Sequence, residues 1–160
     1  AGKARTQKTL AGSSILYGVG VHSGRKSGLI LEPLPANSGI HFAGPGSSQA
    51  VPAHVNYVST TGFATTIKNA DSQVSTIEHL LSALHAAGIT NLLVKCNEEV
   101  PVMDGSAAEF CRIIREIGVE DQGKVDCDER NSERHRNLLL GEQGGRNGNV
   151  QRSKACSAAR

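Results

Sequence analysis

The apolar positions in the first 70 residues form short runs separated by glycine and proline. Runs at residues 15–17 and 28–33 flank the glycine-rich stretch 18–24. Apolar runs of strand length on either side of such a stretch are typical of an antiparallel hairpin. Further runs at 39–42, 51–55 and 65–67 predict short strands of the same sheet.

The hydrophobic period changes from two to 3.6 after residue 70. Ile77, Leu80, Leu81 and Leu84 lie on one helical stripe. A helix is therefore predicted over 76–87. Ser75 is its expected N-cap and Gly88 its C-terminal glycine.

A strand at 91–96 and a second helix at 106–117 are predicted to follow, joined through an acidic turn at Glu98 and Glu99. The second helix has its own apolar stripe, formed by Ala107, Phe110, Ile113, Ile114 and Ile117. This order predicts an α+β two-layer sandwich, with a mostly antiparallel sheet packed on two helices.

The last part of the chain lacks a sustained apolar period. Residues 124–160 carry eight Lys or Arg and five Asp or Glu, for a net charge of +3, whereas residues 1–123 have a net charge of −1. The composition predicts one domain at 1–123 and a low-complexity basic tail at 124–160 that is disordered or translated out of frame.

Charge and cysteine content restrict the classes of function. The basic excess lies in the tail, which has no aromatic residue to stack on bases, so no nucleic-acid partner is expected. The four cysteines have no CxxC spacing and are predicted to be free thiols. With no apolar run of transmembrane length, these features predict a cytoplasmic protein.

The adjacent pair Glu78 and His79, in the sequence STIEHL at 75–80, is the strongest chemical candidate. A neutral imidazole is a good zinc ligand, and a neighbouring carboxylate can act as a general base. The same residues also fit a purely structural role, because Ser75 and Glu78 have the spacing of a capping box. His79 lies nearly opposite the leucine stripe, where simple solvent exposure is the alternative to metal ligation.

Two other segments have candidate roles. The sequence GVGVHSG at 18–24 lacks the following helix of a dinucleotide fingerprint and is predicted to form a tight hairpin turn. The sequence PVMDGSA at 101–107 is predicted to form a turn, with Asp104 or Ser106 capping the second helix. Five histidines are further ligand candidates, but none forms a second motif: His22, His41, His54, His85 and His135.

Taken together, the motifs at 18–24, 75–80, 88–91 and 101–107 resemble the UDP-3-O-acyl-N-acetylglucosamine deacetylase family in order and interval. The resemblance implies a zinc-dependent amidase of lipid A biosynthesis that removes acetate from UDP-3-O-acyl-N-acetylglucosamine. It also implies an enzyme that is usually monomeric. The family fold has two similar domains with the active site between them, and this chain resembles only the first.

The resemblance assigns roles to individual residues. Glu78 is similar to the family's general base and His79 to its first zinc ligand. The loop that contains Gly62, Phe63 and Ala64 is similar to a segment bordering the substrate, although Gly62 and Phe63 depart from the commoner residues.

The second domain of the family carries the remaining zinc ligands and the histidine that acts as general acid. Residues 124–160 match neither, so this truncated chain is expected to be inactive alone. Two alternatives remain. One is a non-catalytic interaction module of the same fold, and the other is an RNA-binding module.

Overall fold

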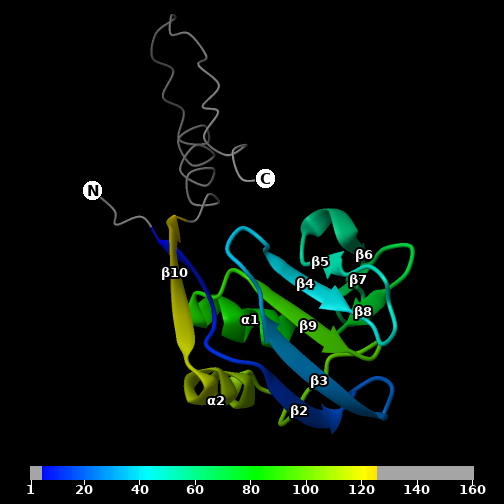
Figure 1. Cartoon of the computed structure of the whole chain (residues 1–160). Helices are drawn as coiled ribbons and strands as arrows, with labels where there is room; N and C mark the ends of the chain where they lie inside the picture. The colour runs from blue at the N-terminus through cyan, green and yellow to red at the C-terminus, as the bar shows by residue number, and fades with distance from the viewer. Residues whose placement is uncertain (1–4, 126–160) are drawn as a thin grey trace, which may run out of the picture. The chain divides into compact units, whose positions relative to one another are not determined.

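The computed structural model describes residues 5–125 (Figure 1). The tail from residue 126 onward, with the predictions made for it, lies outside these residues. In chain order, the elements are β1 Thr6–Leu10, β2 Ser14–Val19, β3 Lys26–Pro33, β4 Ile40–Ala43, β5 Val51–Pro52, the 3-10 helix η1 Val55–Tyr57, β6 Val58–Thr60, β7 Thr66–Lys68, β8 Gln73–Ser75, α1 Glu78–Ala87, β9 Leu92–Cys96, α2 Ala108–Ile117 and β10 Val119–Val125.

A five-stranded sheet in the order β2-β3-β9-β4-β5 forms one layer. The predicted hairpin is confirmed, because β2 pairs with β3 in antiparallel register with Leu16 opposite Leu29. Strand β9 continues this alignment and places Cys96 opposite Leu29. Only the pairing of β4 with β9 is parallel among the described strands of this sheet.

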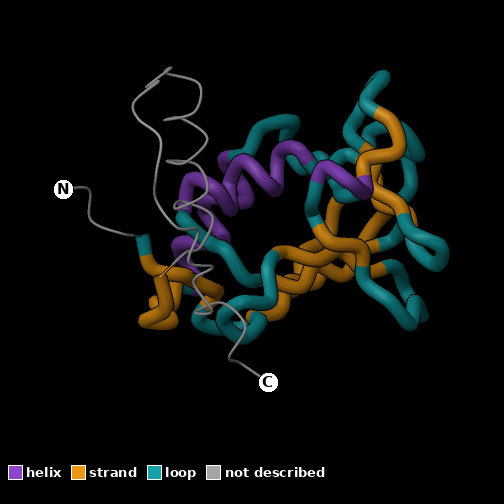
Figure 2. The backbone as a smooth tube through the Cα atoms, turned by 90° about the horizontal axis from the view of Figure 1, so that it is seen from above, coloured by secondary structure: helices purple, strands orange, loops and turns teal. Residues whose placement is uncertain are grey.

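The two helices pack over one face of this sheet, which confirms the two-layer α+β prediction. Figure 2 shows the helices in one layer and the sheet strands in the other. Helix α1 buries Leu80 and Leu84, and α2 buries Phe110. Alternation along β3 turns Leu29 and Leu31 into the same core.

The prediction of a single sheet is wrong. Strand β7, which corresponds to the run predicted at 65–67, lies with β6 and β8 in a separate three-stranded sheet. Strands β1 and β10 form a two-stranded ribbon (Figure 1). Strands β6 and β10 were not predicted because they are mostly exposed and lack an apolar run. Strand β10 reaches Val125, past the predicted domain boundary at residue 123.

Both helices begin two residues later than predicted. Thr76 has a φ of +59°, which a right-handed helix cannot contain, so α1 begins at Glu78. Helix α2 begins at Ala108 after a turn in which the Ser106 hydroxyl accepts the Ala108 N–H at 3.1 Å. The predicted C-terminal glycine of α1 is confirmed, since Gly88 has a left-handed φ of +72°.

Two of the predicted free thiols fall in the described region. Cys96 is buried in the core and Cys111 is half-buried, and both are unpaired. Burial raises the pKa of the Cys96 thiol to about 12. Cys127 and Cys156 lie outside the described residues. Neither described helix is long and apolar enough to cross a membrane.

A buried amide fastens the β1–β10 ribbon to the main sheet. Asn91, which is 1% exposed, donates from Nδ2 to Oε1 of Gln7 at 3.0 Å and to Oε1 of Gln122 at 2.7 Å. Its Oδ1 accepts the N–H of Gly39 at 2.8 Å. One side chain therefore joins β1, β10 and the loop before β4 to the start of β9.

Replacement of Asn91 by leucine, which has a similar shape, is expected to lower the free energy of unfolding by about 2–3 kcal/mol, because buried polar groups lose their partners. Urea denaturation of the whole chain measures this change. Asn97→Ala, at an exposed position, is the matched control and is expected to change stability by less than about 0.5 kcal/mol. Equal effects of the two substitutions would contradict a fastening role for Asn91.

Candidate active site

The pair Glu78 and His79 lies at the first turn of α1, directly after a sharp change in chain direction. Strand β8 ends at Ser75, and Thr76 then adopts a left-handed backbone conformation. For a β-branched residue this conformation costs on the order of 1–3 kcal/mol. Helix α1 begins directly after this turn, and Glu78 and His79 are its first two residues.

The carboxylate of Glu78 accepts a hydrogen bond from the backbone N–H of Thr65, just before β7. The predicted capping box is therefore wrong. Ser75 lies in β8, where its hydroxyl donates to the carbonyl of Glu98 at 3.2 Å instead of capping α1. The N-cap position is Ile77, whose side chain makes no capping bond.

The Glu78 carboxyl is held in its charged form. Partial desolvation raises its pKa, but the backbone N–H and hydroxyl of Thr65, its own backbone N–H and the neighbouring His79 outweigh this effect. The net pKa is below the ordinary value for glutamic acid. Glu78 is thus an anchored carboxylate that can accept a proton at neutral pH.

His79 differs from the solvent-exposed side chain that its helical position predicted. The residue is half-buried, and its Nδ1 atom is buried without a hydrogen-bond partner. It is the only such side-chain nitrogen or oxygen among residues 5–125. Buried polar atoms normally have partners. The bonding capacity of this Nδ1 is therefore left unused by the described residues.

The turn predicted at 101–107 lies beside this pair. Asp104 accepts hydrogen bonds from the N–H and the hydroxyl of Ser106, at 2.9 and 2.8 Å. These bonds lower the pKa of Asp104, and the nearby His79 lowers it further. The N-cap position of α2 is Ala107 and has no side-chain capping bond, so the predicted N-cap at Asp104 or Ser106 is wrong and both residues lie in the turn before the helix.

The loop between β6 and β7 contains the three predicted substrate-binding residues. Gly62 is exposed, Phe63 is 99% exposed and Ala64 is half-buried. The same loop ends at Thr65, whose N–H contacts Glu78. The structure thus brings one end of the segment to the candidate site, and the substrate role stays a prediction.

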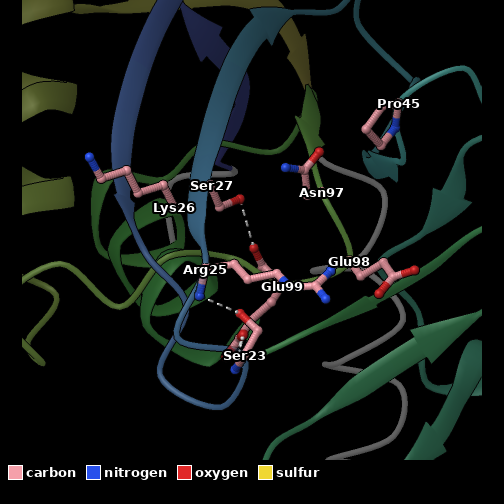
Figure 3. Close-up of a pocket in the computed structure, with 8 residues that line it drawn as sticks. All are labelled: Ser23, Arg25, Lys26, Ser27, Pro45, Asn97, Glu98 and Glu99. Carbon is pink, nitrogen blue, oxygen red and sulfur yellow. Dashed lines mark hydrogen bonds between the residues drawn. The ribbon is translucent and has the colours of Figure 1, made fainter.

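The sequence did not single out Glu99 as a functional residue. Its side chain is 6% exposed, and its carboxylate accepts the N–H of His22 at 2.9 Å, the N–H of Ser23 at 3.0 Å and the Thr76 hydroxyl at 3.3 Å. Its carbonyl accepts the Ser27 hydroxyl at 3.2 Å (Figure 3). In the sequence, the position of Glu99 directly before the apolar segment that starts at Val100 could have indicated a buried carboxylate.

A cavity of about 580 Å³ lies on the other side of Glu99 (Figure 3). Its lining is Ser23, Arg25, Lys26, Ser27, Pro45, Asn97, Glu98 and Glu99. Neither Glu78 nor His79 belongs to it. Its basic and acidic groups are mixed, so it has no single charge that would select a ligand.

The comparison with known proteins confirms the resemblance in the sequence. The sequence model of the LpxC family, UDP-3-O-acyl N-acetylglycosamine deacetylase, matches residues 7–134. The chain belongs to this family. The match continues past the domain boundary predicted at residue 123.

Curated members of the deacetylase family show the same likeness. The protein from Chlamydia muridarum is 42% identical over 123 residues, covering 76% of this chain and 43% of that protein. The protein from Wolinella succinogenes is 43% identical over 117 residues, covering 72% and 39%. The protein from Teredinibacter turnerae is 44% identical over 119 residues, also covering 72% and 39%. The matched region spans less than half of each relative.

The described residues fit the predicted zinc ion only in part. The buried, unpartnered Nδ1 shows that the His79 ring has capacity for a further interaction. Residues 5–125 contain no group of three or more His, Cys, Asp or Glu that could hold a metal, so the other described histidines do not complete a site with His79. His135 lies outside the described residues.

The buried Glu99 carboxylate makes the stability of the deacetylase-family domain depend on pH. Desolvation raises the pKa of Glu99, but its hydrogen bonds from His22, Ser23 and Thr76 outweigh this and lower it. The unfolded chain therefore binds this proton more tightly. The carboxylate's contribution to stability is complete above the ordinary value of 4.5 and is lost as pH falls through the lower folded-state pKa.

Glu99→Gln is accordingly expected to flatten the fall in unfolding free energy between about pH 6 and about pH 3. Urea denaturation across this range, with wild type and variant in parallel, measures the difference. Glu98→Gln, at an exposed neighbouring carboxylate, is the matched control and is expected to keep the wild-type slope. A wild-type slope in Glu99→Gln would show that the buried carboxylate is not the titrating group.

Proposed function

We propose that the described domain supplies one side of a UDP-3-O-acyl-N-acetylglucosamine deacetylase active site, with Glu78 as general base and His79 as one zinc ligand. The observation that carries this proposal is the Glu78 carboxylate, anchored by the Thr65 N–H beside the unpartnered Nδ1 of His79. Membership of the family, and relatives that are named deacetylases, support it.

Removal of acetate from an amide requires water to attack the carbonyl carbon while its proton passes to a base. Glu78 suits that step because its carboxylate is ionised at neutral pH and the Thr65 N–H holds one carboxylate oxygen in place. When bound, Zn²⁺ would supply Lewis acidity at the substrate carbonyl. The imidazole of His79 would hold the ion.

A single ligand is too few for a catalytic zinc site, which normally has three protein ligands. The chain matches 39–43% of the curated relatives' length. We therefore propose that the other ligands and the general acid come from sequence beyond the matched region. In this proposal the 160-residue chain alone binds zinc weakly and does not turn over substrate.

The loop containing Gly62, Phe63 and Ala64 is proposed to border the bound substrate. Phe63 is 99% exposed at the tip of a loop that ends on Glu78 through Thr65. An aromatic ring in this position gains free energy when a ligand or another part of the protein covers it. The proposed setting is a cytoplasmic monomer without a nucleic-acid partner. The net charge of −1 over residues 1–123 supports the absence of a nucleic-acid partner.

Zinc binding tests the assignment of His79 in the chain as it stands. Addition of Zn²⁺ is expected to shift the His79 ring signals in an NMR titration, because this imidazole has an unused nitrogen. His79→Ala is expected to remove the binding. His85→Ala, on the exposed last turn of the same helix, is the control and is expected to leave it unchanged. Equal zinc binding by wild type and His79→Ala would overturn the assignment.

Catalysis by Glu78 is tested in a chimera in which this region replaces the matched part of the Chlamydia muridarum relative. We expect the chimera to release acetate from the UDP-sugar substrate. Glu78→Gln is expected to lower kcat by about 10²–10⁴-fold, the usual contribution of a general base, and to retain zinc. A folded, zinc-loaded chimera whose kcat does not depend on Glu78 would exclude the proposed role.

A further inference from the structure

The buried Glu99 carboxylate connects the glycine-rich turn at residues 18–24 with the segment that precedes α1. From the glycine-rich turn it accepts the N–H groups of His22 and Ser23, and from the segment before α1 it accepts the hydroxyl of Thr76. The carboxylate is thus held by three donors, two from one segment and one from the other. Buried charges of this kind require such partners.

The glycine-rich turn has the shape of a cradle for this carboxylate. A Cβ atom at Gly20 would collide with Oε2 of Glu99 and Oγ of Ser23, so any larger residue there would have to displace these side chains. The turn is closed by Gly20 N–H donating to the carbonyl of Arg25 and by Gly24 N–H donating to the carbonyl of Gly20, both at 2.9 Å. This geometry explains a motif that the chemistry of Glu78 and His79 leaves unused.

Backbone pairing fixes Glu99 beside the turn into α1. The N–H of Ser75 donates to the carbonyl of Glu98 at 2.9 Å, and the N–H of Val100 donates to the carbonyl of Ser75 at 3.0 Å. These two bonds flank Glu99 and form a parallel bridge with the last residue of β8. The carboxylate therefore has little freedom to move away from Thr76.

Thr76 transmits this constraint to the candidate base. Its left-handed backbone is unfavourable for a β-branched residue and persists only where its surroundings hold it. The hydroxyl of Thr76 is held by Glu99, and its N–H donates to the carbonyl of Thr65 at 3.1 Å. The N–H of the same Thr65 donates to the Glu78 carboxylate. A continuous path of hydrogen bonds thus runs from the cradle to Glu78.

We propose that Glu99, bound in the cradle at residues 18–24, is a positioning residue. It fixes the orientation of Glu78 and His79 by holding the left-handed turn at Thr76. It does not touch the reacting atoms. This inference rests on the proposed function for the meaning of the site, but the hydrogen-bond path itself can be measured without zinc or substrate.

The test compares three substitutions in the 160-residue chain by amide NMR. Glu99→Gln keeps the shape of the side chain but places an NH₂ group where two N–H donors converge. Thr76→Val keeps the β-branched shape and loses the hydroxyl, whereas Thr76→Ser keeps the hydroxyl. The measured quantities are the chemical shift and the hydrogen-exchange rate of the Thr65 N–H, which donates to Glu78.

We expect Glu99→Gln and Thr76→Val to shift the Thr65 amide proton and to speed its exchange roughly tenfold, as loss of about one hydrogen bond predicts. Thr76→Ser is expected to stay close to wild type. Asn91→Leu is the control, because it lowers stability beyond the other end of α1 and is expected to leave the Thr65 amide shift unchanged. A wild-type Thr65 amide in folded Glu99→Gln and Thr76→Val would overturn the proposal.

The zinc titration separates failure of this proposal from failure of the proposed function. If both are correct, the zinc affinity of Glu99→Gln falls several-fold relative to wild type. Absence of zinc binding in the wild type, together with a displaced Thr65 amide in the variants, would refute the proposed function and retain the positioning role. Wild-type zinc affinity and an undisturbed amide in both variants would refute the positioning role alone.

Discussion

The candidate site depends on one strained turn, the left-handed conformation of Thr76 between β8 and α1. This turn separates the last residue of β8 from the first turn of α1, which contains Glu78 and His79. A β-branched residue does not adopt this conformation by its own preference. The surroundings impose it, through the buried carboxylate of Glu99 on one side and the backbone of Thr65 on the other.

The constraint on the backbone at Thr76 limits the positions that Glu78 and His79 can take. A backbone held by a buried charge-assisted hydrogen bond has few alternative conformations, so the side chains that follow it start from a fixed position. The core beneath α1 adds to this, because Leu80 and Leu84 anchor the helix on the sheet. Next to this core, the half-buried His79 has a buried Nδ1 without a hydrogen-bond partner.

The fold and the site were predictable to different extents. The hairpin of β2 and β3, both helices and the strand β9 followed from apolar periodicity, since each buries a regular stripe or face. Strands β6 and β10 carry no such pattern and are defined by their pairing partners. At the site, Glu78 and His79 were found from their motif, whereas the role of Glu99 was not, because its donors lie more than 20 residues away in the sequence.

The sequence by itself determined the class of fold and the family, because the hydrophobic period and the order of the motifs can be read directly along the chain. Only the tertiary structure decided what the polar residues do. The spacing of Ser75 and Glu78 fits a capping box, yet in the folded chain Ser75 donates to Glu98 and Glu78 accepts from Thr65. Local spacing gives the bonds that a side chain can make, and the packing of distant segments selects among them.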